Sequence, residues 1–302
     1  MTRIIDFSNC RQIPGRAYNG ANGKKISVEY DSRHYMLKFP PSGAQKLTEL
    51  SYTNNCVSEH IASSIFNILG VKAHYTMLGT FTVGNTMKIV CACLDFTADG
   101  KTLYDFCSIK NTVLDSESDG TGTELFDILE TIEKQKFVAP DRLTEHFWDM
   151  FVVDALLGNF DRHNGNWGFL YDPVTRVSEI APVFDCGSSL LPQADEKVMR
   201  DVLLSDDELR ARVFRYPTSA IKQNDKKINY YDFLIKAENP DCREALKRIY
   251  GRVNMARIQD FIGDVPYISD LQKDFYYRYI TARFNMIVRP AYEIIISDAH
   301  EK

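Results

Sequence analysis

Strand-like and helix-like patterns of hydrophobic residues alternate in the first third of the chain. Apolar positions typical of β-strands occur in four segments, which are residues 25–30, 34–39, 73–81 and 86–94. Only Asp31-Ser32-Arg33 separates the first two, as in a β-hairpin. From Thr53 to Leu69 apolar residues recur every three or four positions, and Gly70 follows, which predicts one helix. We therefore predict a β-rich first lobe over residues 1–95, with one sheet and one helix.

Helical spacing dominates the remainder, residues 96–302. Helices are predicted over 123–135, over 142–157 and repeatedly from Asn229 to the end, including a long stretch from 269 to 296. Two short strands, 167–171 and 178–184, flank the turn dipeptide Asp172-Pro173. The polar segment 95–100 is interpreted as a hinge, and the acidic segment 115–122 as a surface loop. The predicted fold class is α+β, with a β-rich N-lobe and a mainly helical C-lobe.

Length and charge narrow the class of protein. At 302 residues the chain has the size at which one core commonly divides into two. Its net charge of −5 argues against direct nucleic-acid binding, which needs clustered Lys and Arg. The N-terminus has no apolar leader-like region, and no stretch has the apolar length of a membrane span. We expect a cytoplasmic protein with no membrane span.

The seven cysteines form an odd number without a regular framework, which predicts reduced thiols and no disulfide bonds. Cys91-x-Cys93 has the spacing of half a metal site. The apolar residues Ile89, Val90 and Leu94 around it favour a buried strand instead. No zinc site is expected.

One polar segment carries the chemistry. Residues 159–166, with the sequence NFDRHNGN, follow a predicted helix, and Asp185 follows the next two strands. Phosphoryl transfer needs an acid to accept or orient a hydroxyl proton, for which we assign Asp161. It also needs oxygen ligands for Mg²⁺, for which we assign Asn166 and Asp185. His163 is expected to support this loop by bonding its backbone rather than to act as a base. Asp and Asn also favour ordinary turns, but the surrounding helix and strands favour the catalytic interpretation.

Nucleotide contacts are predicted in the first lobe. Period-two alternation places Lys38 and Met36 on one face of their strand, so Lys38 can contact the α- and β-phosphates while Met36 lies against adenine. Main-chain groups of residues 91–94, including Cys91 and Cys93, are expected to face the adenine edge. A surface lysine on a half-exposed strand is the alternative for Lys38.

The turn-rich segment 15–24 is a candidate cover for the phosphates. Gly20 and Gly23 allow backbone N–H groups to approach an anion closely, and Lys24 follows them. The segment matches neither the Walker A motif nor the spacing of the standard protein-kinase loop. A glycine-rich hairpin loop is therefore an equal alternative.

Taken together, the motif at 161–166 and the residues Asp185-Cys186-Gly187-Ser188 resemble the catalytic and metal loops of the HipA-like serine/threonine kinases. Residues 35–40 are similar to the strand that carries their nucleotide lysine. The similarity covers most of the chain and is to the short, free-standing members, which lack the extra N-terminal segment of the toxin kinases paired with a DNA-binding antitoxin. It implies a two-lobed protein-kinase-like fold, ATP and Mg²⁺ in the cleft, and Glu59 as the helix glutamate that pairs with Lys38. A solvated helix glutamate is the alternative for Glu59. A protein serine or threonine is the implied acceptor, with autophosphorylation expected.

Three alternatives stay open at this point. Phosphoinositide kinases share the Asp-Arg-His-x-x-Asn pattern, although residues 190–197 are not basic, as a membrane-facing segment near the substrate would be. A non-catalytic relative would be expected to lose one of the four key residues, and all four are present: Lys38, Asp161, Asn166 and Asp185. The toxin role of the larger family is the third, and the sequence identifies no antitoxin partner, physiological substrate or oligomeric state.

Overall fold

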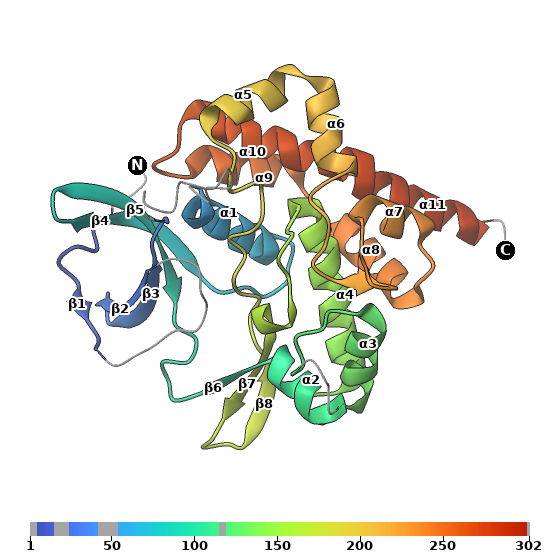
Figure 1. Ribbon diagram of the computed structural model, residues 1–302, viewed down its shortest axis with the longest axis horizontal. Helices are drawn as coiled ribbons and strands as arrows, with labels where there is room; N and C mark the ends of the chain where they lie inside the picture. Colours follow the sequence, from blue (N-terminus) through green and yellow to red (C-terminus); the bar gives the residue numbers. More distant parts are fainter. Residues whose placement is uncertain (1–4, 15–23, 42–53, 115–118, 301–302) are drawn as a thin grey trace.

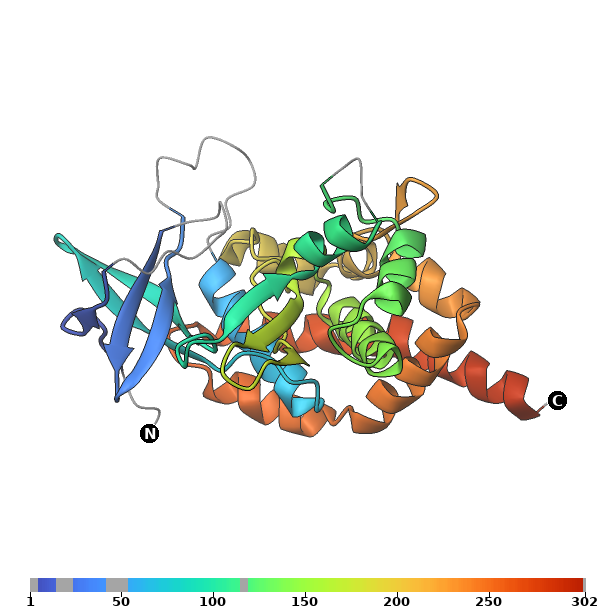
Figure 2. The ribbon, with the colours of Figure 1, turned by 90° about the horizontal axis from the view of Figure 1, so that it is seen from below.

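A strand-rich N-terminal lobe and a helical C-terminal lobe make up the computed structural model, which describes residues 5–14, 24–41, 54–114 and 119–300 (Figures 1 and 2). This confirms the predicted α+β, two-lobed fold class. The position of the boundary after residue 95 stays a prediction. Within the described ranges no helix combines the length and apolarity that a membrane span requires.

The N-lobe sheet is antiparallel, with the strand order β1-β2-β3-β5-β4. Its strands are β1 Arg11–Gln12, β2 Lys25–Tyr30, β3 Arg33–Lys38, β4 Thr76–Val83 and β5 Thr86–Leu94. The predicted β2–β3 hairpin is confirmed. Asp31 and Ser32 both have positive φ, 50° and 58°, which is the conformation that a tight two-residue hairpin turn requires.

The two faces of β3 point to different cores, as its alternation predicted. Tyr35 and Leu37 are buried in a small cluster with Phe7, Val28 and Val90 on the outer side of the sheet. The opposite face, with Met36 and Lys38, is turned toward helix α1, Asn55–Ile68. Figure 1 shows α1 between this sheet and the helices of the C-lobe, so α1 belongs to the main core that joins the two lobes.

The C-lobe is built around helix α4, and its elements are as follows: α2 Phe106–Leu114, α3 Leu125–Lys134, α4 Pro140–Leu157, α5 Glu196–Leu204, α6 Asp206–Phe214, α7 Tyr230–Lys236, α8 Pro240–Arg252, α9 Met255–Asp264, α10 Asp270–Arg283 and α11 Arg289–His300, with β6 Thr102–Asp105, β7 Gly168–Asp172, β8 Val177–Ile180, β9 Lys222–Gln223 and β10 Lys226–Lys227. Helix α4 is buried from Phe147 to its end at Leu157. The long helical stretch predicted over 269–296 is divided by a π-helical turn, Phe284–Val288, between α10 and α11.

Several elements had no sequence prediction. Strand β6 completes a three-stranded sheet of order β6-β7-β8, helix α2 packs against the loop that carries Asp161, and helices α5 and α6 lie against α10. Strand β8 ends at Ile180, four residues before the predicted end, because Val183 leaves the hairpin and bridges to Ala73 in the N-lobe. That bridge brings the segment with Asp185 up to the first lobe.

The predicted acidic surface loop is partly a packed element. Residues 115–118 lie outside the described ranges, but Gly120 is buried with φ 75°, and a Cβ there would collide with the carbonyl of Cys107. Asn164 Nδ2 donates hydrogen bonds of 2.8 Å to the carbonyls of both Gly120 and Gly122. The end of the acidic segment therefore supports the loop that carries Asp161.

Candidate active site

Helix α4 ends where the polar loop begins. Gly158 caps the helix in the left-handed conformation, with φ 65°, and a Cβ at this position would collide with Tyr279 and Pro217. Asn159 follows and is buried; its Oδ1 accepts the backbone N–H of Asp161 at 3.1 Å, and its carbonyl accepts the hydroxyl of Tyr230 at 2.6 Å. The start of the loop is therefore held from both sides by the C-lobe core.

Arg162 is the structural centre of this loop. Its Nε donates to Asp154 Oδ2 on α4 at 2.9 Å, and its Nη1 donates to the carbonyls of Asn166 at 2.9 Å and Phe184 at 2.5 Å. One buried guanidinium thus connects the helix, the Asp161 loop and the Asp185 loop. The motif assigned no role to Arg162, but Asp154, an acid within a strongly apolar helix, is the sign in the sequence of a buried ion pair.

Asp161 and Asn166 are brought together as predicted. Asn166 Nδ2 donates to the carbonyl of Asp161 at 2.8 Å, which leaves the amide oxygen as the atom that Asn166 can offer to a cation. Burial raises the pKa of the Asp161 carboxyl above its ordinary value, and the negative charge of Asp185 acts in the same direction, whereas His163 opposes it. The Asp161 carboxyl therefore binds a proton more readily in the folded protein than it would in water.

Asp185 lies near enough to Asp161 for the charge of one carboxylate to act on the other. Its backbone has φ 57°, a left-handed conformation that is costly for a residue other than glycine and is often found at functional sites. The charge of Lys38 lowers the pKa of the Asp185 carboxyl, against the opposing effect of burial. With its side chain 42% exposed, Asp185 can present carboxylate oxygen to a ligand. The carboxylates and the Asn166 amide are hard oxygen donors, so this set of residues fits Mg²⁺.

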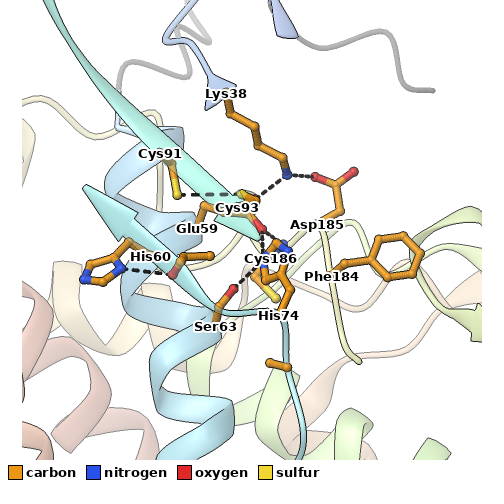
Figure 3. Close-up of polar contacts among 12 residues, drawn as sticks. Lys38, Glu59, His60, Ser63, His74, Cys91, Cys93, Phe184, Asp185 and Cys186 are labelled. Atoms are coloured by element: carbon orange, nitrogen blue, oxygen red, sulfur yellow. Dashed lines mark hydrogen bonds and ion pairs between the residues drawn. The ribbon is translucent and has the colours of Figure 1, made fainter. Parts of the chain in front are cut away.

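Lys38 joins the two lobes electrostatically. Its Nζ lies 2.7 Å from Glu59 Oε2 and 2.7 Å from Asp185 Oδ1 (Figure 3). Burial by itself would lower the pKa of Lys38, but the two carboxylates hold it well above its ordinary value. Glu59 is almost fully buried, and although burial alone would raise its pKa, the charge of Lys38 and the hydrogen bond from His74 lower it. The lysine is therefore charged and rigidly oriented.

The second oxygen of Glu59 has partners of its own. Its Oε1 accepts the backbone N–H of Cys186 at 2.9 Å and lies 2.8 Å from His74 Nε2 (Figure 3). Glu59 thus fixes both Lys38 and the residue that follows Asp185. His74 could not be predicted from the sequence, because only the turn of the chain after α1 brings it back beside that helix.

Three more of the predicted site residues, His163, Met36 and Lys24, lie within the described ranges. His163 is exposed, and its Nδ1 accepts the backbone N–H of Gly165 at 3.0 Å, so the backbone bond predicted for it is present. Met36 is half-buried on the same face as Lys38. Lys24 is exposed, with its Nζ 5.6 Å from the centre of the Phe39 ring, and Gly20 and Gly23 lie outside the described residues. Lys25, which the sequence analysis did not single out, pairs with Lys38 across the β2–β3 hairpin.

The main chain of Cys91 and Cys93 does not face an adenine site, contrary to the prediction. Strand β5 is flanked on both sides, since Cys91 pairs with Lys38 and Leu78, and Cys93 pairs with Met36 and Thr76. Backbone groups of a strand with two neighbours are used within the sheet. Both cysteines are buried, as the predicted buried strand implied, but they offer no free backbone edge to adenine.

Known proteins resemble this chain at three levels. The HipA-like C-terminal domain family matches residues 17–256. The serine/threonine-protein kinase CtkA of Helicobacter pylori is 48% identical over 289 residues, which is 95% of this chain and 87% of that protein. A crystal structure of a Helicobacter pylori proinflammatory kinase CtkA matches with a TM-score of 0.91 and 46% identity, covering 97% of this chain and 99% of the other. The HipA–HipB–operator DNA complex of Shewanella oneidensis MR-1 contains a chain with a TM-score of 0.55 at 15% identity, covering 93% of this chain and 70% of that one, which shows the fold alone.

The fold and the buried lysine–glutamate pair define the class of the protein, which is a two-lobed phosphotransferase. The chain belongs to the HipA-like C-terminal domain family, because that family matches most of its length and a kinase relative is 48% identical over 95% of it. The family resemblance expected from the motifs is therefore confirmed.

Proposed function

We propose that this protein is an ATP- and Mg²⁺-dependent serine/threonine protein kinase. One observation carries the proposal: Lys38 Nζ lies 2.7 Å from both Glu59 Oε2 and Asp185 Oδ1, at the junction of the two lobes. A kinase is active only when this lysine–glutamate pair and an adjacent metal-binding aspartate are both in position. The name of the relative CtkA, a serine/threonine-protein kinase, supports the acceptor class.

In this proposal Lys38 contacts the α- and β-phosphates, and Glu59 holds its ammonium group in position. Lys25, opposite Lys38 on β2, adds a second positive charge to the same face. Asp185 and Asn166 would hold Mg²⁺, which neutralises the charge that develops on the transferred phosphoryl group. The phosphates of a bound nucleotide would replace Asp185 as one partner of Lys38.

Asp161 is proposed to orient the acceptor hydroxyl and receive its proton. The raised pKa of this carboxyl makes it a better proton acceptor than an ordinary aspartate. Asn159 and Arg162 hold the backbone on either side of it, so the carboxylate starts from a fixed position. His163 is proposed to stabilise the loop from outside.

Adenine is proposed to lie between Met36 and the segment after β5. Because the backbone of Cys91 and Cys93 is paired on both sides, the main-chain contacts to adenine are proposed for the segment after β5. The N–H groups of Asp95, Ala98 and Gly100 donate within the chain, so Phe96 and Asp99 are the proposed contacts. Gly20, Gly23 and Lys24 are proposed to cover the phosphates.

The acceptor is proposed to be a serine or threonine of a protein, with autophosphorylation as one reaction. The seven free cysteines agree with a reducing compartment, so the cytoplasm is the proposed location.

The test is to incubate the purified protein with γ-labelled ATP and Mg²⁺, alone, with generic protein acceptors, and with phosphoinositide vesicles. We expect phosphoserine or phosphothreonine, in the protein itself or in an added acceptor, and no labelled lipid. Asp161→Asn serves as the matched inactive control. Lipid labelling without any phosphoprotein would overturn the acceptor assignment, and no transfer to any acceptor would overturn the proposed activity.

A further inference from the structure

Behind Lys38 lies a buried group of three side chains that the kinase mechanism does not fully use. Glu59, His74 and Cys93 each offer one ligand atom, and these atoms all lie within 4.8 Å of one another. Their side chains come from α1, from the segment before β4 and from β5, and Figure 3 shows them gathered beneath the ammonium group of Lys38. All three residues are buried. A carboxylate, an imidazole and a thiol that converge in this way form a metal-ligand set.

A second sulfur lies beside the group. Cys91 Sγ lies 3.9 Å from Cys93 Sγ, because residues two apart on a strand share one face. Its ligand atom is outside the group of mutually close atoms, so Cys91 is a neighbour of the three ligands and not a fourth member of the set.

The chemistry of the set selects its ligand. Mg²⁺ prefers an octahedral shell of oxygen atoms, which a thiol and an imidazole do not provide. A set of sulfur, nitrogen and carboxylate donors favours Zn²⁺. We propose that Glu59, His74 and Cys93 form an inhibitory binding site for Zn²⁺, with the fourth position of the ion left to solvent. On binding, the proton of the Cys93 thiol leaves to solvent, and the metal replaces the contacts of His74 Nε2 with Glu59 and Ser63.

The site differs from a structural zinc centre in sharing a ligand with the catalytic apparatus. Glu59 Oε2 holds Lys38, while Oε1 holds both His74 and the backbone N–H of Cys186. A zinc ion on Oε1 takes the carboxylate from Cys186 and adds positive charge beside the Lys38 ammonium. The Asp185 loop then loses the bond that orients it, and the Lys38 ammonium is repelled from its place beside Glu59. The inhibition rests on the proposed function, but the binding of zinc does not.

The binding experiment uses Co²⁺ as a spectroscopic substitute for Zn²⁺. Titration of the reduced, metal-free full-length protein with Co²⁺ is expected to produce a thiolate-to-cobalt charge-transfer band that saturates at one equivalent and disappears when Zn²⁺ is added. Cys93→Ser should weaken Zn²⁺ binding by at least about 100-fold, more than the loss of an outer partner usually causes. Cys242→Ser removes a buried cysteine from α8 in the C-lobe and should bind like the wild type.

The activity experiment separates the two parts of the inference. Preincubation with Zn²⁺, at a constant excess of Mg²⁺–ATP, should reduce the kinase rate of the wild type and of Cys242→Ser by about tenfold or more. The rate of Cys93→Ser should change by less than about twofold relative to the rate of the same variant without Zn²⁺. His74→Gln serves as a second ligand variant should Cys93→Ser fail to give a native circular dichroism spectrum.

Three outcomes would overturn the inference. A wild type without the charge-transfer band, or a band of equal strength in Cys93→Ser and His74→Gln, would refute the site. Zinc bound at the site without loss of kinase activity would refute the inhibitory role. If the protein shows no kinase activity at all, the proposed function fails, and the cobalt titration still decides whether the metal site exists.

Discussion

The guanidinium group of Arg162 and the carboxylate of Asp154 form a buried ion pair, with 2.9 Å between Nε and Oδ2 and each side chain only 1% exposed. The pair joins the helix that supports the catalytic loop to the loop itself. Arg162 also donates to the backbone of Asn166 and Phe184, so it holds both proposed metal-binding segments in one arrangement. Breaking a buried pair by removing one partner leaves an uncompensated charge, which is far more costly than losing a surface pair.

The first prediction concerns this pair. Asp154→Asn should lower the free energy of unfolding by about 3–5 kcal/mol, since the Arg162 charge stays buried without its counter-ion. Urea denaturation followed by circular dichroism measures this value. Asp201→Asn, which breaks the exposed pair between Lys197 and Asp201, should cost less than about 1 kcal/mol. A loss of similar size in both variants would contradict the structural role given to Arg162.

The second prediction tests the lysine at the lobe junction. Lys38→Met keeps the aliphatic stem and removes the charge that Glu59 and Asp185 share, so we expect at least about a 100-fold loss of kcat/KM for ATP. Lys38→Ala should be equally inactive. Steady-state kinetics with varied ATP measure the effect, and near-normal turnover by Lys38→Met would show that the phosphate-binding lysine has been misassigned.

The third prediction separates the two aspartates. Thermal shift with Mg²⁺–ATP reports nucleotide binding without turnover, since a ligand at a hundredfold excess over its Kd stabilises the folded state by about 2.7 kcal/mol. Asp161→Asn should be inactive yet retain most of the wild-type shift, because Asp161 is assigned to the acceptor hydroxyl. Asp185→Asn should be inactive and lose the Mg²⁺-dependent part of the shift. An exchange of these behaviours would reverse the two roles.

The fourth prediction concerns stability at low pH. Burial lowers the pKa of His146 on α4 to about 4, and the charge of Arg162 acts in the same direction. An unfolded chain takes up this proton at the ordinary histidine pKa of 6.5, so the folded state is favoured above that value and loses stability as the pH falls toward 4.

The expected loss from this histidine is about 1–2 kcal/mol between about pH 7.5 and pH 5, allowing for its partial exposure. Urea denaturation at the two pH values measures it. His146→Gln should show a smaller loss over the same interval, because glutamine does not titrate. Equal losses in the wild type and His146→Gln would mean that other groups control the pH dependence.

Local patterns in the sequence were sufficient to predict the elements that position the site. The period-two alternation at 34–39 predicted which face of β3 carries Lys38, and the helical spacing at 53–69 predicted α1. These predictions succeeded because each depends on neighbours within a few residues. The spacing of Asp161, Asn166 and Asp185 likewise identified the phosphotransferase motif, whereas the role assigned to each residue stays a prediction.

Tertiary structure decided which side chains surround those residues. Lys38 and Asp185 are 147 positions apart, and Glu59 and Cys186 are 127 apart, so their contacts depend on how the whole chain folds back between the lobes. The same holds for His74, which meets Glu59 and Cys93 only after α1 and β5 pack together. Sequence periodicity shows which face of an element is buried, but burial by itself does not say which distant group lies on the other side. For this protein the sequence determined the catalytic elements, and packing between the lobes determined that Glu59 serves Lys38 and a buried thiol–imidazole cluster at once.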